Sequence, residues 1–149
     1  MEDTEKHFNC TLPIQLRFSD TDMLGHVSNT VYQQLYDCGK VNYFDIVLGN
    51  HDWENTALVL ASLNSNFIIP IYLADSISVQ TRTSEIGTKS ITLEQQLIDN
   101  ETGEIKSNCR AILVCFSQKL KTSVEIPQEW KDKIQLFDKQ VYIKPKKAE

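Results

Sequence analysis

The sequence predicts an α+β domain in which one long helix packs on an antiparallel sheet. Over residues 29–48 apolar side chains recur at three- and four-residue spacing, which indicates the helix. Residues 57–125 instead alternate between apolar and polar positions, as half-buried strands do. The turns between these strands are too short for the crossovers that parallel strands need. We therefore expect the helix to cover most of one face of an antiparallel sheet.

The first element is expected to be a strand that leads into a polar turn. Ile14, Leu16 and Phe18 alternate with Gln15 and Arg17, the period of a strand with one buried face. An Asp-rich turn follows and interrupts this alternation. The chain should therefore reverse direction before the helix begins.

The long helix has signals at both of its ends. Ser28 or Asn29 is suited to cap the first turn, and Gly49 is a plausible stop. The apolar positions that would face the sheet are Tyr32, Leu35, Tyr36, Tyr43, Ile46 and Val47. A helix with an apolar face buries that face against another element, so this one should pack on the sheet.

Four strands and a short helix are expected after the long helix. The strands are predicted at 59–69, 77–83, 91–97 and 105–116, with Pro70 ending the first of them. The run Asp99-Asn100-Glu101-Thr102-Gly103 indicates a hairpin turn. Pro127 should open a short amphipathic helix with Trp130, Ile134 and Phe137 on one face.

Composition limits the classes of function. The 149 residues (17.1 kDa) suffice for one domain with a sizeable core. A formal net charge of -5 argues against nucleic acid as the main partner. No run approaches the roughly 20 apolar residues of a membrane span. The polar first residues do not resemble a signal peptide, so we expect a cytoplasmic protein.

We assign residues 1–138 to a single domain and residues 139–149 to a basic C-terminal tail. The tail holds four lysines and one glutamate, a net charge of +3. Such a tail is expected to fray in solvent, and the alternative is a loose basic arm that meets anionic phosphates.

The cysteines indicate neither a disulfide framework nor a metal site. Cys10, Cys38, Cys109 and Cys115 have no Cys-x-x-Cys pair and no regular spacing. Without a secretory signal they should be reduced, and Cys109 and Cys115 share a buried strand face. A nucleophilic cysteine would need a nearby base, and no histidine lies close in sequence to Cys38, Cys109 or Cys115.

The turn before the long helix combines the groups that acyl-transfer chemistry needs. Asp22 stands in a polar loop, Gly25 permits a sharp bend, and Asn29 lies where the helix begins. A carboxylate at this place can attack a carbonyl or activate water, while free helix N–H groups stabilise an oxyanion. An Asp in such a loop is also commonly a turn-forming residue.

The same residues resemble a known family. The pattern Arg-Phe-x-Asp-Thr-Asp-x-x-Gly-His-Val-x-Asn-x-x-Tyr covers residues 17–32, and the acidic Asp37 follows five positions later. This pattern is similar to that of the hotdog-fold acyl-CoA thioesterases, in particular the 4-hydroxybenzoyl-CoA thioesterase-like branch. The resemblance extends through residues 67–70, 74–79 and 85–90.

The resemblance implies a fold, an assembly and a site. It implies a hotdog fold, a curved five-stranded antiparallel sheet wrapped around one long central helix. It also implies homodimers or homotetramers with active sites at the subunit interface. Asp22 matches the catalytic carboxylate, and Asn29 matches the residue whose backbone amide polarises the thioester carbonyl. Ser28, Asp37 and Lys40 depart from the residues usual in the family (Asn, Glu and Arg), which bears on substrate preference.

Further residues are candidates for catalysis or substrate binding, and several of them have a structural role as the alternative. His26 is a possible general base, although a histidine in a Gly-containing loop more often orients the backbone. Tyr32 belongs to the core or to the pocket wall. The candidate substrate-binding residues are Gly25, Tyr32, Asp37, Arg82, Lys89 and Ser90; of these, Arg82, Lys89 and Ser90 either reach CoA phosphates or are solvated strand ends.

The leading hypothesis is hydrolysis of acyl-CoA, with Asp22 as nucleophile or as general base. It needs no metal and no cofactor beyond the CoA of the substrate. The alternatives are a non-catalytic acyl-thioester-binding module and a hydratase or dehydratase that uses Asp22 with His26. Because the expected apolar channel shows no evident buried Arg or Lys, uncharged acyl groups should be preferred.

Overall fold

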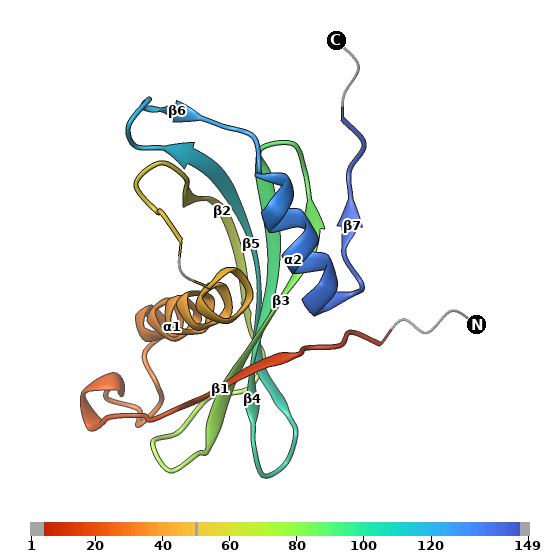
Figure 1. The fold of residues 1–149 in the computed structure, drawn as a ribbon. Coiled ribbons are helices and arrows are strands. Elements are labelled where there is room, and N and C mark those ends of the chain that lie inside the picture. Colours follow the sequence, from red (N-terminus) through yellow and green to blue (C-terminus); the bar gives the residue numbers. More distant parts are fainter. Residues whose placement is uncertain (1–4, 50, 147–149) are drawn as a thin grey trace.

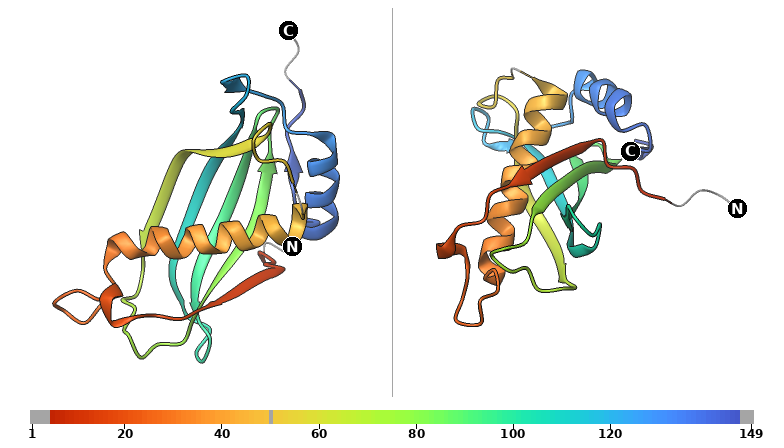
Figure 2. Two further views of the ribbon diagram at one scale, coloured as in Figure 1. Left: turned by 60° about the vertical axis from the view of Figure 1, so that its left-hand side comes forward. Right: turned by 90° about the horizontal axis from the view of Figure 1, so that it is seen from below.

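The computed structural model describes residues 5–49 and 51–146, and it shows one long helix lying across a curved sheet (Figure 1). The helix, α1, spans Asn29–Leu48, as predicted. The main strands are β1 (Cys10–Ile14), β2 (Ala57–Phe67), β3 (Ile77–Ile86), β4 (Ser90–Asp99) and β5 (Ile105–Ser117). Their order in the sheet is β1-β3-β4-β5-β2, and all neighbours are antiparallel. Figure 2 shows α1 running across these strands on one face.

Two short strands extend the five-stranded sheet that was predicted. β6 (Thr122–Ser123) pairs with β5, and β7 (Tyr142–Ile143) pairs in parallel with β3. Strands of two residues carry no alternating pattern, so the sequence holds no signal for them. β7 lies in the segment expected to fray, so this part of the tail is ordered against the sheet. The short helix α2 (Gln128–Asp138) begins directly after Pro127, as predicted.

The first strand lies earlier in the chain than predicted. β1 ends at Ile14, and Phe18 lies in the 3-10 helix η1 (Phe18–Asp20) with 83% of its surface exposed. The reason is Asp20, a buried carboxylate that accepts hydrogen bonds from the Arg17 N–H at 2.8 Å and from the Arg17 side chain at 3.2 Å. These contacts turn the chain before the alternation can continue as a strand.

Helix α1 packs very closely on the sheet at Gly39. A Cβ at this position would lie 2.7 Å from Val79 Cγ2 and 3.1 Å from Thr81 Oγ1, so only glycine fits. The buried Tyr43, one helical turn further along, hydrogen-bonds Thr83 of β3 and Asp138 of α2. The position of α1, and of its N-terminus, is therefore fixed by the sheet.

The edge strand β2 is more exposed than its pattern suggested. Val59 is 50% exposed, Leu63 41% and Phe67 55%, although alternation predicted one buried face. β2 pairs with β5 on one side only, and no other strand of the described chain pairs with its outer edge. The outer edge of such a strand presents backbone N–H and C=O groups that can pair with another chain.

Candidate active site

The loop before α1 folds back on itself as a small hairpin. Gly25 has φ +78°, the left-handed region that glycine adopts without strain, and its N–H donates to the Asp22 carbonyl at 3.0 Å. The Asp22 N–H donates to the His26 carbonyl at 2.8 Å, and Thr21 pairs with Val27 as an isolated bridge. The contribution of Gly25 is therefore to form the turn that holds Asp22 in position.

The Asp22 carboxylate is held through one of its oxygens. Oδ1 accepts the Leu24 N–H at 2.9 Å and the His26 N–H at 3.3 Å. No donor within the described ranges hydrogen-bonds the other oxygen, Oδ2. Asp22 is exposed, so Oδ2 is accessible to a substrate or to water.

The first turn of α1 presents unsatisfied N–H groups beside this carboxylate. Ser28 occupies the N-cap position, but its hydroxyl pairs with Thr30 Oγ1 at 3.1 Å and makes no capping bond. Asn29 is the first helical residue, where an N–H has no partner within the helix. The positive end of the helix dipole adds to its attraction for an oxyanion.

The structure brings four of the predicted residues together around one open cleft of about 530 Å³. Asp22, His26, Asn29 and Tyr32 line it from the loop and α1. The rest of the wall is formed by Val27 and by residues 67–70, at and after the end of β2. The buried Tyr32 ring meets the Phe67 ring edge to face, with 4.8 Å between centroids. Burial raises the pKa of Tyr32, so its hydroxyl is neutral at pH 7.

His26 contacts Asp22 through its backbone. Its N–H and carbonyl both bond Asp22, and its ring meets the Tyr72 ring edge to face at 4.9 Å. His26 and Tyr72 also form an isolated antiparallel bridge. This geometry favours the orienting reading of His26 over the general-base reading.

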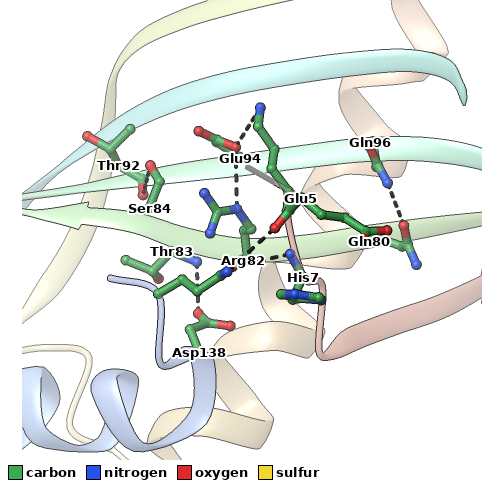
Figure 3. A network of polar contacts seen from close by, with 12 residues as sticks. Glu5, His7, Gln80, Arg82, Thr83, Ser84, Thr92, Glu94, Gln96 and Asp138 are labelled. Carbon is green, nitrogen blue, oxygen red and sulfur yellow. Dashed lines mark hydrogen bonds and ion pairs between the residues drawn. The ribbon is translucent and has the colours of Figure 1, made fainter. Parts of the chain in front are cut away.

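The other predicted substrate contacts lie away from the cleft within one chain. Asp37 is exposed on α1, where it pairs with Lys40 at 3.1 Å. Lys89 and Ser90 lie at the turn between β3 and β4, at the opposite end of β3 from the cleft. Arg82 is buried in the middle of β3 and pairs with Glu94 of β4 at 3.3 Å (Figure 3). Arg82 is therefore no solvated strand end.

The burial of two cations, Arg82 and Lys106, was not predicted. Each has a carboxylate partner: Glu94 for Arg82, and Asp75 at 3.8 Å for Lys106. Neither cation lines the cleft, whose walls hold no Arg or Lys among the described residues. A polar residue on the outer face of a strand gives the same sequence pattern whether or not another segment covers it. The alternation therefore could not indicate that Arg82 and Lys106 are buried.

The cysteines are free and mostly buried. Burial raises the pKa of Cys109 and of Cys115 to about 11, so both are neutral thiols at pH 7. Across residues 5–49 and 51–146, no group of three or more His, Cys, Asp or Glu side chains is arranged to hold a metal ion. Nor does any helix in this part of the chain have the length and apolar character of a membrane span.

Comparison with known proteins places this geometry in context. The profile of the thioesterase-like superfamily matches residues 16–134. The uncharacterized protein YsmA of Bacillus subtilis is 25% identical over 119 residues, 80% of each chain. The long-chain acyl-CoA thioesterase FadM of Escherichia coli is 22% identical over 128 residues, 82% of this chain and 94% of that one.

A solved structure of similar fold carries a ligand. The thioesterase of Thermus thermophilus, complexed with coenzyme A and Zn, superposes with a TM-score of 0.77 at 25% identity. The match covers 89% of this chain and 96% of that one. The likeness confirms the predicted hotdog fold, with a curved antiparallel sheet against one long helix.

Proposed function

We propose an acyl-CoA thioesterase activity for this chain, which belongs to the thioesterase-like superfamily. The chain is a thioester hydrolase, and acyl-CoA is the substrate class that we infer for it. The E. coli relative is a long-chain acyl-CoA thioesterase, and the T. thermophilus structure contains coenzyme A. Both support a CoA ester as the substrate.

The observation that carries the proposal is the meeting of Asp22 and the start of α1 in one cleft. A thioester carbonyl placed between them would accept a hydrogen bond from the Asn29 backbone N–H as its oxygen becomes negative. Asp22 Oδ2 would face the carbonyl carbon. The helix dipole favours the oxyanion in the transition state more than the neutral ground state.

Two chemical routes use these groups. In the first, Asp22 attacks the carbonyl carbon, the C–S bond breaks, CoA leaves as a thiolate, and water then hydrolyses the mixed anhydride. In the second, Asp22 takes a proton from water as that water attacks, and the same C–S bond breaks. Neither route requires a metal ion or a further cofactor.

Release of free CoA from acyl-CoA, followed with a thiol reagent, tests the proposal. Hydrolysis by the wild type and its loss in Asp22→Asn are the expected results. Binding of acyl-CoA without CoA release would indicate the non-catalytic module, and water addition across an enoyl-CoA double bond would indicate the hydratase. An acyl-carrier-protein thioester in the same assay identifies the carrier.

A single turnover in oxygen-18 water tests for the covalent route. Label found in the Asp22 carboxylate after one cycle would establish the covalent route. Label found only in the released acid would show that water attacks the acyl carbon, which the general-base route requires and which hydrolysis of the anhydride at that carbon also gives.

We further propose that the active form is a homodimer or homotetramer in which subunits pair through β2. Antiparallel pairing of two β2 strands about their midpoint would place residue 57 of one chain beside residue 67 of its partner. The β3–β4 turn lies two strands from β2, at the same end as residue 57. Lys89 and Ser90 of one subunit would then approach the cleft of the other, where they could pair CoA phosphates.

The same interface would give Asp37 access to a substrate held in the neighbouring subunit's cleft, since its side chain is exposed on α1.

A cytoplasmic location stays a prediction, which fractionation of cells that express the tagged chain would test.

A further inference from the structure

A series of contacts connects β5 with the loop that carries Asp22. The residues that make these contacts, Lys106, Asp75 and Tyr72, have no role in the chemistry described above. We propose that Tyr72 is a positioning residue for Asp22, and that Asp75 and Lys106 hold Tyr72 in place. The inference rests on the proposed function, because Asp22 is the proposed catalytic carboxylate.

The series begins at a buried ion pair. Lys106 of β5 is 7% exposed, and its Nζ lies 3.8 Å from Asp75 Oδ2. A buried ammonium group is costly without a counter-charge, so Lys106 fixes where the Asp75 carboxylate lies. The same Oδ2 accepts the Tyr72 N–H at 2.8 Å, and the Asp75 N–H donates to the Tyr72 carbonyl at 3.0 Å. These bonds close the turn over residues 72–75.

Lys106 also holds the wall of the cleft. Its backbone carbonyl accepts the N–H groups of Ile68 and Ile69 at 2.9 and 3.1 Å. Both residues line the same cleft as Asp22. Through its backbone and its side chain, Lys106 therefore connects the cleft wall with the Tyr72 turn.

Tyr72 passes this constraint to the catalytic loop. Its ring meets the His26 ring at an interplanar angle of 88°, and the two residues pair as a bridge. The next residues are joined as well, since the Val27 N–H donates to the Ile71 carbonyl at 2.7 Å. His26 in turn donates its N–H to Asp22 Oδ1 and accepts the Asp22 N–H. A shift of Tyr72 would thus move the group that orients the carboxylate.

The size of the effect follows from geometry. A displacement of about 1 Å at a reacting group can lower a rate by ~10²-fold. Tyr72 does not line the cleft, so its loss should leave substrate binding largely intact. The expected signature is a fall in kcat of roughly 10- to 100-fold with KM changed by less than about twofold.

The experiment compares three variants in the acyl-CoA assay. Tyr72→Ala removes the ring and should show the fall in kcat. Tyr72→Phe keeps the ring and should retain wild-type kcat. Leu73→Ala is the matched control, because Leu73 is an exposed neighbour in the same loop. A kcat for Tyr72→Ala within twofold of wild type, or an equal loss in Leu73→Ala, overturns the proposal.

A double variant separates positioning from general damage. If Tyr72 acts through Asp22, adding Tyr72→Ala to Asp22→Asn should cause no further loss of the residual rate. A further loss of the same size as in the wild-type background would mean that Tyr72 acts elsewhere, which also overturns the proposal.

A structural readout keeps this proposal separate from the proposed function. The Leu24 and His26 amide resonances report the bonds to Asp22 Oδ1, and Tyr72→Ala should shift them while Leu73→Ala should not. A wild type that releases no CoA would contradict the proposed function, and the amide shifts would still decide whether Tyr72 positions Asp22. If the Leu24 and His26 amide resonances do not shift in Tyr72→Ala, Tyr72 does not position Asp22, even where the wild type hydrolyses acyl-CoA.

Discussion

The Tyr36 hydroxyl lies 2.6 Å from the Ser107 hydroxyl, and this buried hydrogen bond joins α1 to β5. Ser107 donates its own proton to the Asn66 carbonyl of β2 at 2.8 Å, so Tyr36 is the donor in the first bond. Burial raises the pKa of Tyr36, which keeps this donor protonated at neutral pH. The chain of bonds fixes α1, which carries Asn29, relative to the end of β2, which carries Phe67. The two walls of the cleft are therefore connected through buried hydrogen bonds.

The close approach of α1 to β3 predicts that Gly39→Ala is destabilising. The new Cβ would lie 2.7 Å from one methyl of Val79 and 2.9 Å from the other, so the helix must move away from the sheet. Overpacking of this kind costs about 1–3 kcal/mol. Urea unfolding followed by circular dichroism measures the change. Cys38→Ala serves as the control, because Cys38 is an exposed neighbour on the same helix. A Gly39→Ala protein as stable as wild type would contradict the packing described.

The loop geometry predicts different effects at its two aspartates. Asp22→Asn keeps the shape of the side chain but removes the charge, so turnover should fall by ~10²–10⁴-fold. The stability of this variant should change little, because Asp22 is exposed. Asp20→Asn should instead lower the melting temperature, since the buried Asp20 carboxylate holds Arg17. Near-wild-type hydrolysis by Asp22→Asn would show that the site is assigned to the wrong residue.

The sequence was sufficient for the helix and for the turn that precedes it. The bounds of α1 follow from its apolar spacing and from Ser28 and Gly49 at its ends, which are local signals. The gathering of Asp22 and Asn29 is also local, because few residues separate them. The turn at Gly25 needed only the freedom of glycine to adopt a positive φ.

Contacts between distant segments could not be read from the sequence. Tyr72 meets His26 only because β3 starts beside the Asp22 loop, and no periodicity reports that. Lys106 and Arg82 alternate as solvent-facing strand residues would, yet both are buried. The exposure of β2 likewise depends on its place at the sheet edge, which is a property of strand order.

The buried carboxyl of Asp138 predicts a pH-dependent stability. It accepts a hydrogen bond from the Thr83 N–H (Figure 3) and another from the Tyr43 hydroxyl. Burial outweighs these bonds and raises the pKa of Asp138. Because its pKa is higher in the folded than in the unfolded protein, Asp138 makes its full contribution to the free energy of unfolding below the unfolded pKa of about 3.9. That contribution is lost as pH rises through the higher folded pKa.

The test is the pH dependence of unfolding in Asp138→Asn, which cannot ionise at this position. Relative to the variant, the wild type should lose stability as pH rises from about 4 toward neutrality. Chemical unfolding at several pH values gives the difference directly. A constant difference across this range would mean that the pKa of Asp138 is not raised.

The exposed edge of β2 predicts that assembly depends on this strand. Light scattering at micromolar concentration should give two or four times 17.1 kDa for the wild type. Leu63→Lys places a charge on the exposed apolar edge and should shift the protein toward monomer. Loss of hydrolysis together with assembly is expected, because Lys89 and Ser90 of the neighbouring subunit would be withdrawn. A clean monomer with full activity would exclude a shared site.

The lining of the cleft predicts the acyl groups that the enzyme prefers. Tyr32, Phe67 and Ile69 offer apolar surface, and the described lining has no Arg or Lys to pair a substrate carboxylate. Uncharged acyl groups should therefore be better substrates than dicarboxylic ones, since a buried unpaired carboxylate is costly. Longer aliphatic chains should gain up to ~0.8 kcal/mol per buried CH₂ until the cleft is full.

Values of kcat/KM for the acetyl, hexanoyl, lauroyl, benzoyl and succinyl thioesters of CoA test this preference. Phe67→Ala is the matched variant, because its ring packs on Tyr32 at the wall of the cleft. Phe67→Ala should lower kcat/KM for hexanoyl-CoA by a larger factor than it lowers kcat/KM for acetyl-CoA. Succinyl-CoA as the best substrate would overturn this reading of the cleft. A flat profile across chain length, unchanged in Phe67→Ala, would show that the acyl chain does not contact this wall.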